Sequence, residues 1–273
     1  MENIVQDSPE DVEAKAMLAL LLWESERNDL PITSYVAINA LLQQVFDANP
    51  MHPAHHFRIH LWDRERAEMA LHSAGMAGPS LPGIAHMWHM PGHIYSKLNR
   101  YQDAVWQQEA SARVDHAHMM RDRVMPDQIH NFAHNNEWLI RNLVKIGRVP
   151  QAIDLATNML ELPRHPKYNS VSGGSSKLGR ERLLLVLSSY RLWPELIKFA
   201  DTMYLEATED SELQVERLRY LGIAHAFTSS IDKAAALKSD LADRLTKATA
   251  ELEALNTQPK EEVKEEVKEE VKE

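Results

Sequence analysis

The strongest constraint on the fold is a set of small and aromatic residues at helical spacing between residues 84 and 104. Trp88, Gly92 and Tyr95 follow the spacing W-x3-G-x2-Y, Asn99 starts a turn, and Ala104 comes early in the next segment. Small residues let two paired helices approach closely, while aromatic side chains fill the space between them. The spacing therefore predicts two helices packed against each other.

Weaker copies of this pattern recur along the chain, and together they resemble the tetratricopeptide repeat family. Only nine glycines and 13 prolines occur in 273 residues, and no alternating strand pattern is present. The resemblance implies an all-α, right-handed solenoid of antiparallel helix pairs over residues 1–255, with about six units and the best repeats at 84–162. The expected pairs are 10–26 with 32–48, 53–62 with 65–74, the pair that starts near 84, 127–162, 183–207, and 221 onward with 233–255.

Two segments lie outside this pattern. Residues 166–176 are rich in glycine and serine and are expected to form a flexible loop. Residues 256–273 are expected to form a solvated, partly helical linker or tail, because a Lys-Glu-Glu-Val unit repeats from residue 260 onward.

Composition excludes several classes of function. The chain has no cysteine, so it has neither disulfides nor thiolate catalysis. Its net charge of −10 argues against a nucleic-acid partner, because phosphate binding requires clustered lysine and arginine. No apolar run is long enough to span a membrane, and the N-terminus does not read as a signal peptide. We expect a cytoplasmic protein if the chain is complete, whereas an exported location stays open if it is part of a longer protein.

Histidines carry the main functional signal. Twelve of the 14 lie between residues 52 and 134, and several share one face of a predicted helix. The aligned sets are His56 with His60, His86 with His89 and His93, and His130 with His134. Because they fall at the groove-facing positions of the repeats they resemble, three neighbouring helices are expected to present them to one concave groove.

Two functions fit such a groove. One is a binding or scaffold module whose groove holds a protein or peptide partner, or another domain of a larger polypeptide. The residues expected to line it are His86, His130, Asn131 and Arg141. The alternative is a divalent-metal site, since neutral imidazole binds Zn, Fe, Cu and Ni. The candidate ligands are His56, His60, Asp63, His89, His93, His134 and Glu137.

A metal site makes a geometric demand that packing alone does not make. Imidazole nitrogens from different helices must lie within about 4–5 Å of one another if they are to share an ion. The H-E-x-x-H spacing of metalloproteases is absent. The sequence therefore decides neither whether the chain is an enzyme nor what it acts on, and simple packing of the histidines also stays open.

Neighbouring residues add two expectations. Pro91 and Gly92 interrupt the helical pattern beside the histidines, so the segment is expected to form either a kinked helix or an ill-fitting turn. Asn131, Asn135 and Asn136 are placed either to orient imidazoles or to cap a helix.

A more specific resemblance rests on two short motifs. Ile59, His60 and Asp63 match an I-H-x-x-D motif, and residues 89–94 match H-M-P-x-H-I. The stretch from Asp11 to about Ala226 resembles the repeat region of bacterial tetratricopeptide proteins, some of which also carry a redoxin domain. That grouping implies no established reaction, and redoxin chemistry would require cysteines from outside this chain.

Overall fold

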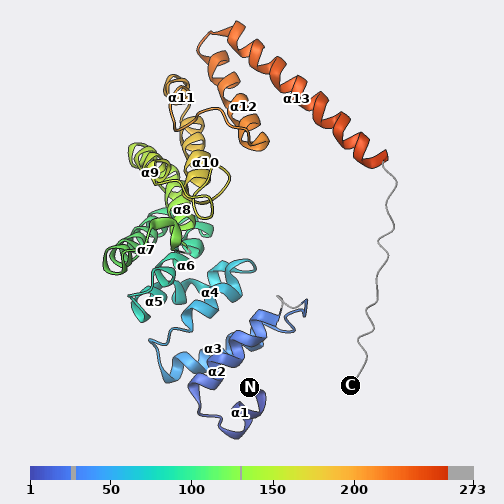
Figure 1. Ribbon diagram of the computed structural model, residues 1–273. Helices are drawn as coiled ribbons and strands as arrows, with labels where there is room; N and C mark the ends of the chain where they lie inside the picture. Colours follow the sequence, from blue (N-terminus) through green and yellow to red (C-terminus); the bar gives the residue numbers. More distant parts are fainter. Residues whose placement is uncertain (26–28, 130, 258–273) are drawn as a thin grey trace. The chain divides into compact units, whose positions relative to one another are not determined.

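The computed structural model describes residues 1–25, 29–129 and 131–257, and within those ranges the chain is helical without a named strand (Figure 1). Consecutive helices are joined mostly by short connections, which makes neighbouring helices antiparallel. The all-α fold of helix pairs is therefore confirmed. None of the described helices is both long and apolar enough to cross a membrane.

The chain divides into two compact units. Among the described residues, the first comprises 1–192 with 203–205, and the second comprises 193–202 with 206–257. The helices of the first unit are α1 (Glu2–Asp7), α2 (Val12–Glu24), α3 (Tyr35–Ala48), α4 (His55–Asp63), η2 (Ala67–Ala70), α5 (Leu71–Ser80), α6 (Ala85–Lys97), α7 (Tyr101–Asp122), η3 (Pro126–Gln128), α8 (Phe132–Lys145), α9 (Val149–Glu161) and α10 (Gly174–Ser189). Those of the second are α11 (Trp193–Ala200), α12 (Ser211–Phe227) and α13 (Ile231–Thr257).

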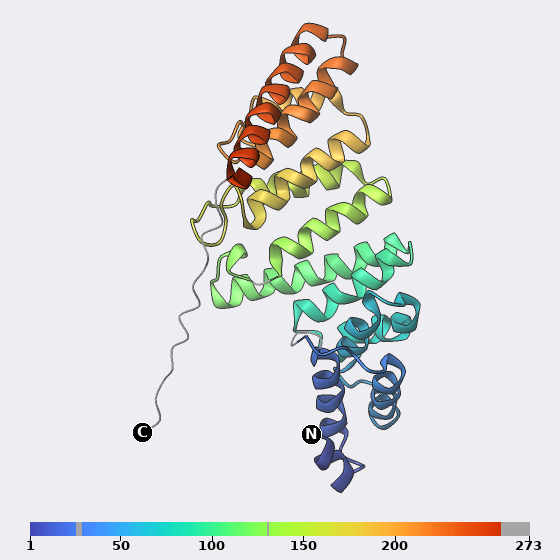
Figure 2. The same ribbon diagram turned by 90° about the vertical axis from the view of Figure 1, so that its right-hand side faces the viewer.

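In the first unit the helices pack in sequence order. The pairs α2–α3, α4–α5, α6–α7 and α8–α9 each pack together, and α10 packs on both α8 and α9 (Figure 2). In the second unit α12 packs on α11 and α13. The pair expected at 183–207 is thus divided, because α10 belongs to the first unit and α11 to the second. Residues 258–273, most of the expected tail, lie outside the described part of the chain.

The pair predicted from residues 84–104 forms α6 and α7. Ala104 is fully buried, and Gly92 faces the side chain of Gln108 on α7, where a Cβ atom would come within 2.8 Å of Nε2. On the other side of α6, the Trp88 ring lies against Gly78 of α5. Small residues on two neighbouring helices therefore permit the close packing around α6.

Pro91 is buried inside α6, and the helix continues past it to Lys97. The segment is therefore not a turn. Proline has no backbone N–H, so α6 lacks the hydrogen bond that residue 91 would otherwise donate to the Met87 carbonyl oxygen.

Candidate metal centre

Six described histidines gather on one side of the first unit. His56 and His60 are on α4, His86, His89 and His93 are on α6, and His134 is on α8. Residues four apart on a helix share a face, so His56 and His60 lie on one face of α4, and His89 and His93 lie on one face of α6. The His56 ring of α4 lies 4.9 Å from the His86 ring of α6, and the His89 ring of α6 lies 4.9 Å from the His134 ring of α8.

The first triad is His89, His93 and His134. Each offers a ring nitrogen, and the three nitrogens lie within 4.8 Å of one another. His89 Nε2 is 2.8 Å from His93 Nε2, and the His89 and His134 ring centroids are 4.9 Å apart. These residues come from α6 and α8, so the condition that nitrogens from different helices approach within about 4–5 Å is met.

Asn135 determines which nitrogen of His89 is available. The Asn135 side-chain amide donates to the Gln108 carbonyl oxygen at 3.1 Å, so its Oδ1 is the atom that faces His89 Nδ1 at 3.0 Å. An oxygen there requires a proton on His89 Nδ1, which leaves the lone pair on Nε2. This is the tautomer that a metal ion needs.

Burial keeps two members of this triad, His89 and His93, neutral. Desolvation lowers the pKa of His89 to about 3, and together with the neighbouring His89 and His134 rings it lowers the pKa of His93 to about 2. Both imidazoles are therefore uncharged at neutral pH. A neutral imidazole is the form that binds metals.

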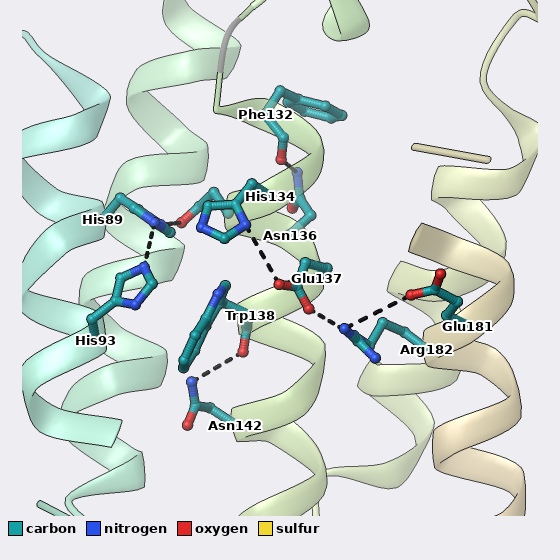
Figure 3. Close-up of polar contacts among 11 residues, drawn as sticks. His89, His93, Phe132, His134, Asn136, Glu137, Trp138, Asn142, Glu181 and Arg182 are labelled. Carbon is teal, nitrogen blue, oxygen red and sulfur yellow. Dashed lines mark hydrogen bonds and ion pairs between the residues drawn. The ribbon is translucent and has the colours of Figure 1, made fainter. Parts of the chain in front are cut away.

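Glu137 contacts His134 but is not itself one of the three residues of the triad. Its Oε1 is 3.5 Å from His134 Nδ1, and its Oε2 accepts from Arg182 Nε at 2.7 Å. Figure 3 shows His134 between Glu137 and the His89–His93 pair. The carboxylate predicted as a direct ligand thus lies where it would orient His134.

A second triad consists of His56, His60 and His86, whose ligand nitrogens also lie within 4.8 Å of one another. His56 Nε2 and His60 Nε2 are 2.9 Å apart, and the His56 and His86 rings are 4.9 Å apart. Trp23 of α2 stacks on His60 with centroids 4.9 Å apart. Desolvation lowers the pKa of His56 to about 3, so this imidazole is also neutral.

The remaining predicted residues lie around the triads. Asp63 forms an ion pair with Lys97 at 3.0 Å and is not in either triad. The amide of Asn131 contacts His86 Nδ1. Arg141 is exposed and its guanidinium lies over the Trp138 ring at 4.2 Å. His130 lies outside the described residues.

A groove of about 600 Å³ lies over both triads. His60 and His86 line it from one triad, and His89, His93 and His134 line it from the other. Trp23 and Tyr35 add aromatic walls, and the charged residues that line it are Glu24, Asp63, Arg64 and Glu65. A small molecule in this groove would reach both sets of imidazoles.

Several contributing residues were not predicted. Trp23 stacks on His60 from a helix about 35 positions earlier, Gln108 holds Asn135, and Arg182 holds Glu137. None of the three lies in a histidine row. Their roles depend on how separate helices pack against one another, and the spacing of residues within one helix does not predict that packing.

Comparisons with known proteins give likeness of structure only. No family model matches the chain, and no curated protein matches it. Similar solved structures include YrrB, a tetratricopeptide protein with an unusual peptide-binding site, at 16% identity and TM-score 0.49, covering 78% of this chain and 97% of YrrB. PilF of Pseudomonas aeruginosa is 15% identical with TM-score 0.49 and covers 90% of this chain and 96% of its own. A kinesin light chain from Podosopora anserina with nearly identical tetratricopeptide-like repeats is 12% identical with TM-score 0.40, over 88% and 97% of the two chains.

Proposed function

We propose that the first unit binds a first-row transition-metal ion through His89, His93 and His134. The observation that carries this proposal is the approach of three ring nitrogens from two helices to within 4.8 Å. A hydrogen bond between His89 and His93 satisfies those two nitrogens as a pair, so it gives no reason for a nitrogen of His134 to approach both of them.

The surroundings of the triad support the same proposal. Asn135 holds the His89 tautomer that leaves Nε2 free to bind, and Glu137 lies at His134 Nδ1. Partners of this kind, behind the coordinating imidazoles, are a regular feature of histidine metal sites. Three protein ligands also leave a coordination position open toward the groove.

The donor set limits the metal. All three donors are imidazoles and the chain has no thiolate, a combination that suits Zn, Cu, Ni and Fe and does not suit Mg or Ca. Within a site of this type, affinity for divalent first-row metal ions rises from Mn²⁺ through Fe²⁺ and Ni²⁺ to Cu²⁺ and is lower again for Zn²⁺. Copper and zinc are therefore the ions to test first.

The test is elemental analysis of protein purified without a histidine tag, together with melting curves before and after chelation. We expect bound metal in the native chain and a melting temperature that falls when the metal is removed. His134→Ala should lose the ion that this triad holds and so contain one ion fewer than the native chain. His116→Ala, which removes an exposed histidine on α7, should keep it. A native protein that contains no metal and does not respond to added Cu²⁺ or Zn²⁺ would overturn the proposal.

A groove that binds a peptide is the second candidate. Its support is the exposed Arg141 guanidinium on the Trp138 ring, which gives a flat surface that is both cationic and aromatic, in a fold suited to binding surfaces. Peptides selected from a display library should bind the native chain without metal and bind Arg141→Ala more weakly. Binding that disappears on chelation would instead favour the metal centre.

A further inference from the structure

We infer that His56, His60 and His86 hold a second transition-metal ion beside the first, so that the groove contains a two-metal centre. This inference rests on the proposed function, because it requires that the triad of His89, His93 and His134 binds metal. It goes further by assigning an ion to the other triad and by making the two ions neighbours.

The second triad has the same construction as the first. It takes two histidines four apart on one helix and one histidine from another, and its ring nitrogens lie within the same 4.8 Å. In each triad the two histidines four apart have Nε2 atoms 2.8 to 2.9 Å apart. Without an ion, the two imidazoles of such a pair can share one proton in a hydrogen bond. With an ion, both can point a nitrogen lone pair at it.

The two triads meet on α6. His86 belongs to one and His89 to the other, and their rings are stacked with centroids 5.8 Å apart. His60 and His86 are likewise stacked at 6.0 Å. The six imidazoles therefore form one continuous row of rings, and all of them except His56 line the same groove.

Charge near the groove suits a pair of cations. An imidazole bound to a metal brings no negative charge, so two divalent ions would repel each other unless carboxylates or a bridging anion offset them. Three carboxylates, those of Glu24, Asp63 and Glu65, line the groove, against one cation, Arg64. Lys97 balances Asp63 from outside this lining set, so the groove keeps an excess of negative charge.

The open positions define what the centre can take. Three imidazoles for each ion leave at least one coordination position open per ion, and five of the six imidazoles line the groove. A small anion or small oxygen-donor molecule that bridges two ions is the class of ligand that fits them.

The decisive measurement is the number of ions per chain. The tag-free native chain should take up two equivalents of Cu²⁺ in a titration followed by elemental analysis. His86→Ala and His134→Ala should each retain one, the double variant none, and His116→Ala two. Loss of folding in a variant is detected by circular dichroism, and the native stoichiometry stands without any variant.

Electron paramagnetic resonance supplies a second reading that does not depend on counting. Two neighbouring Cu²⁺ ions should show a coupled or diminished signal, whereas each single variant should show the signal of an isolated ion. A native chain with one ion, unchanged by His86→Ala, would overturn the two-metal inference and leave the proposed function intact. A native chain with no ion would overturn both.

Discussion

The Asn135 side chain binds His89 Nδ1 at 3.0 Å and thereby fixes which nitrogen of His89 faces the neighbouring imidazoles. Asn135 is itself fixed by the backbone of Gln108, at 3.1 Å, so the orientation of a candidate ligand on α6 depends on α7 and α8 together. A polar contact between fully buried groups of this kind sets a tautomer as well as a position.

Replacing Asn135 by leucine should weaken metal binding. Without the acceptor at Nδ1, His89 is free to place its proton on Nε2, and outer partners of this kind are worth roughly 10- to 100-fold in affinity. The dissociation constant, measured by competition with a chelator of known affinity, should rise by that factor. Asn136→Ala is the matched control, because that amide donates to the Phe132 carbonyl oxygen and not to an imidazole. Equal effects of the two variants would contradict the assigned role.

Gly78→Ala should destabilise the first unit by about 1–3 kcal/mol, the usual cost of overpacking a core. An added Cβ would lie 2.3 Å from the Trp88 ring, which has to move with α6. Gly83→Ala is the control, because nothing lies within 4 Å of its Cβ position. Urea unfolding followed by tryptophan fluorescence gives both free energies. A Gly78 variant as stable as the Gly83 variant would show that α5 and α6 are not in contact there.

Asp115→Asn should change how stability depends on pH. Burial raises the pKa of Asp115 from its ordinary 3.8 to about 6, with the opposing charge of His118 only partly offsetting it, so the folded chain favours the protonated acid. The folded state therefore binds a proton more tightly than the unfolded state. The stabilisation that the protonated Asp115 gives to the folded state is complete below about pH 4 and is lost as the pH rises through about 6.

The measurement is the difference between native and Asp115→Asn unfolding free energies from pH 4 to pH 8. Relative to its value at pH 4, the difference should shift in favour of the variant by roughly 2 kcal/mol at pH 7, given about 1.4 kcal/mol per pKa unit. Other carboxylates titrate in both proteins and cancel. A difference that is flat across this range would mean that Asp115 is not buried as the fold places it.

Arg182→Ala should destabilise the first unit by roughly 2–4 kcal/mol. The change leaves Glu137, whose side chain is 6% exposed, as a buried carboxylate without its cation. Arg66→Ala is the control, because the Arg66–Glu68 pair is more than half exposed and should be worth under about 1 kcal/mol. Thermal unfolding compares the two. Adding Glu137→Gln to Arg182→Ala should recover part of the loss, and no recovery would indicate lost packing and not an unpaired charge.

Local patterns were enough to predict the helices and the histidine rows. The spacing of Trp88, Gly92 and Tyr95 and the position of Ala104 identified the α6–α7 pair, because glycine and alanine at a close approach leave a local signature. Histidines four apart necessarily share a face once the helix is established. The placement of His86 beside His56 depends on how α4 packs against α6, which no spacing within one helix records.

The segment at 166–176 shows a different limit. Its glycine and serine content predicted a flexible loop throughout, but α10 begins at Gly174. The reason is a contact across the fold: the Asp127 carboxylate accepts hydrogen bonds from Ser175 N at 2.9 Å and Ser175 Oγ at 2.7 Å. A helix start stabilised from 48 residues away cannot be read from local composition.

The helices between the histidine rows act as spacers. All six clustered histidines come from α4, α6 and α8, while α5 packs on α4 and α6, and α7 packs on α6 and α8. The volumes of side chains in α5 and α7, with Gly78 and Ala104 among the smallest, therefore help to set the distance between one imidazole row and the next. The coordination geometry of the groove can thus be tuned by substitutions in helices that contribute no ligand to it.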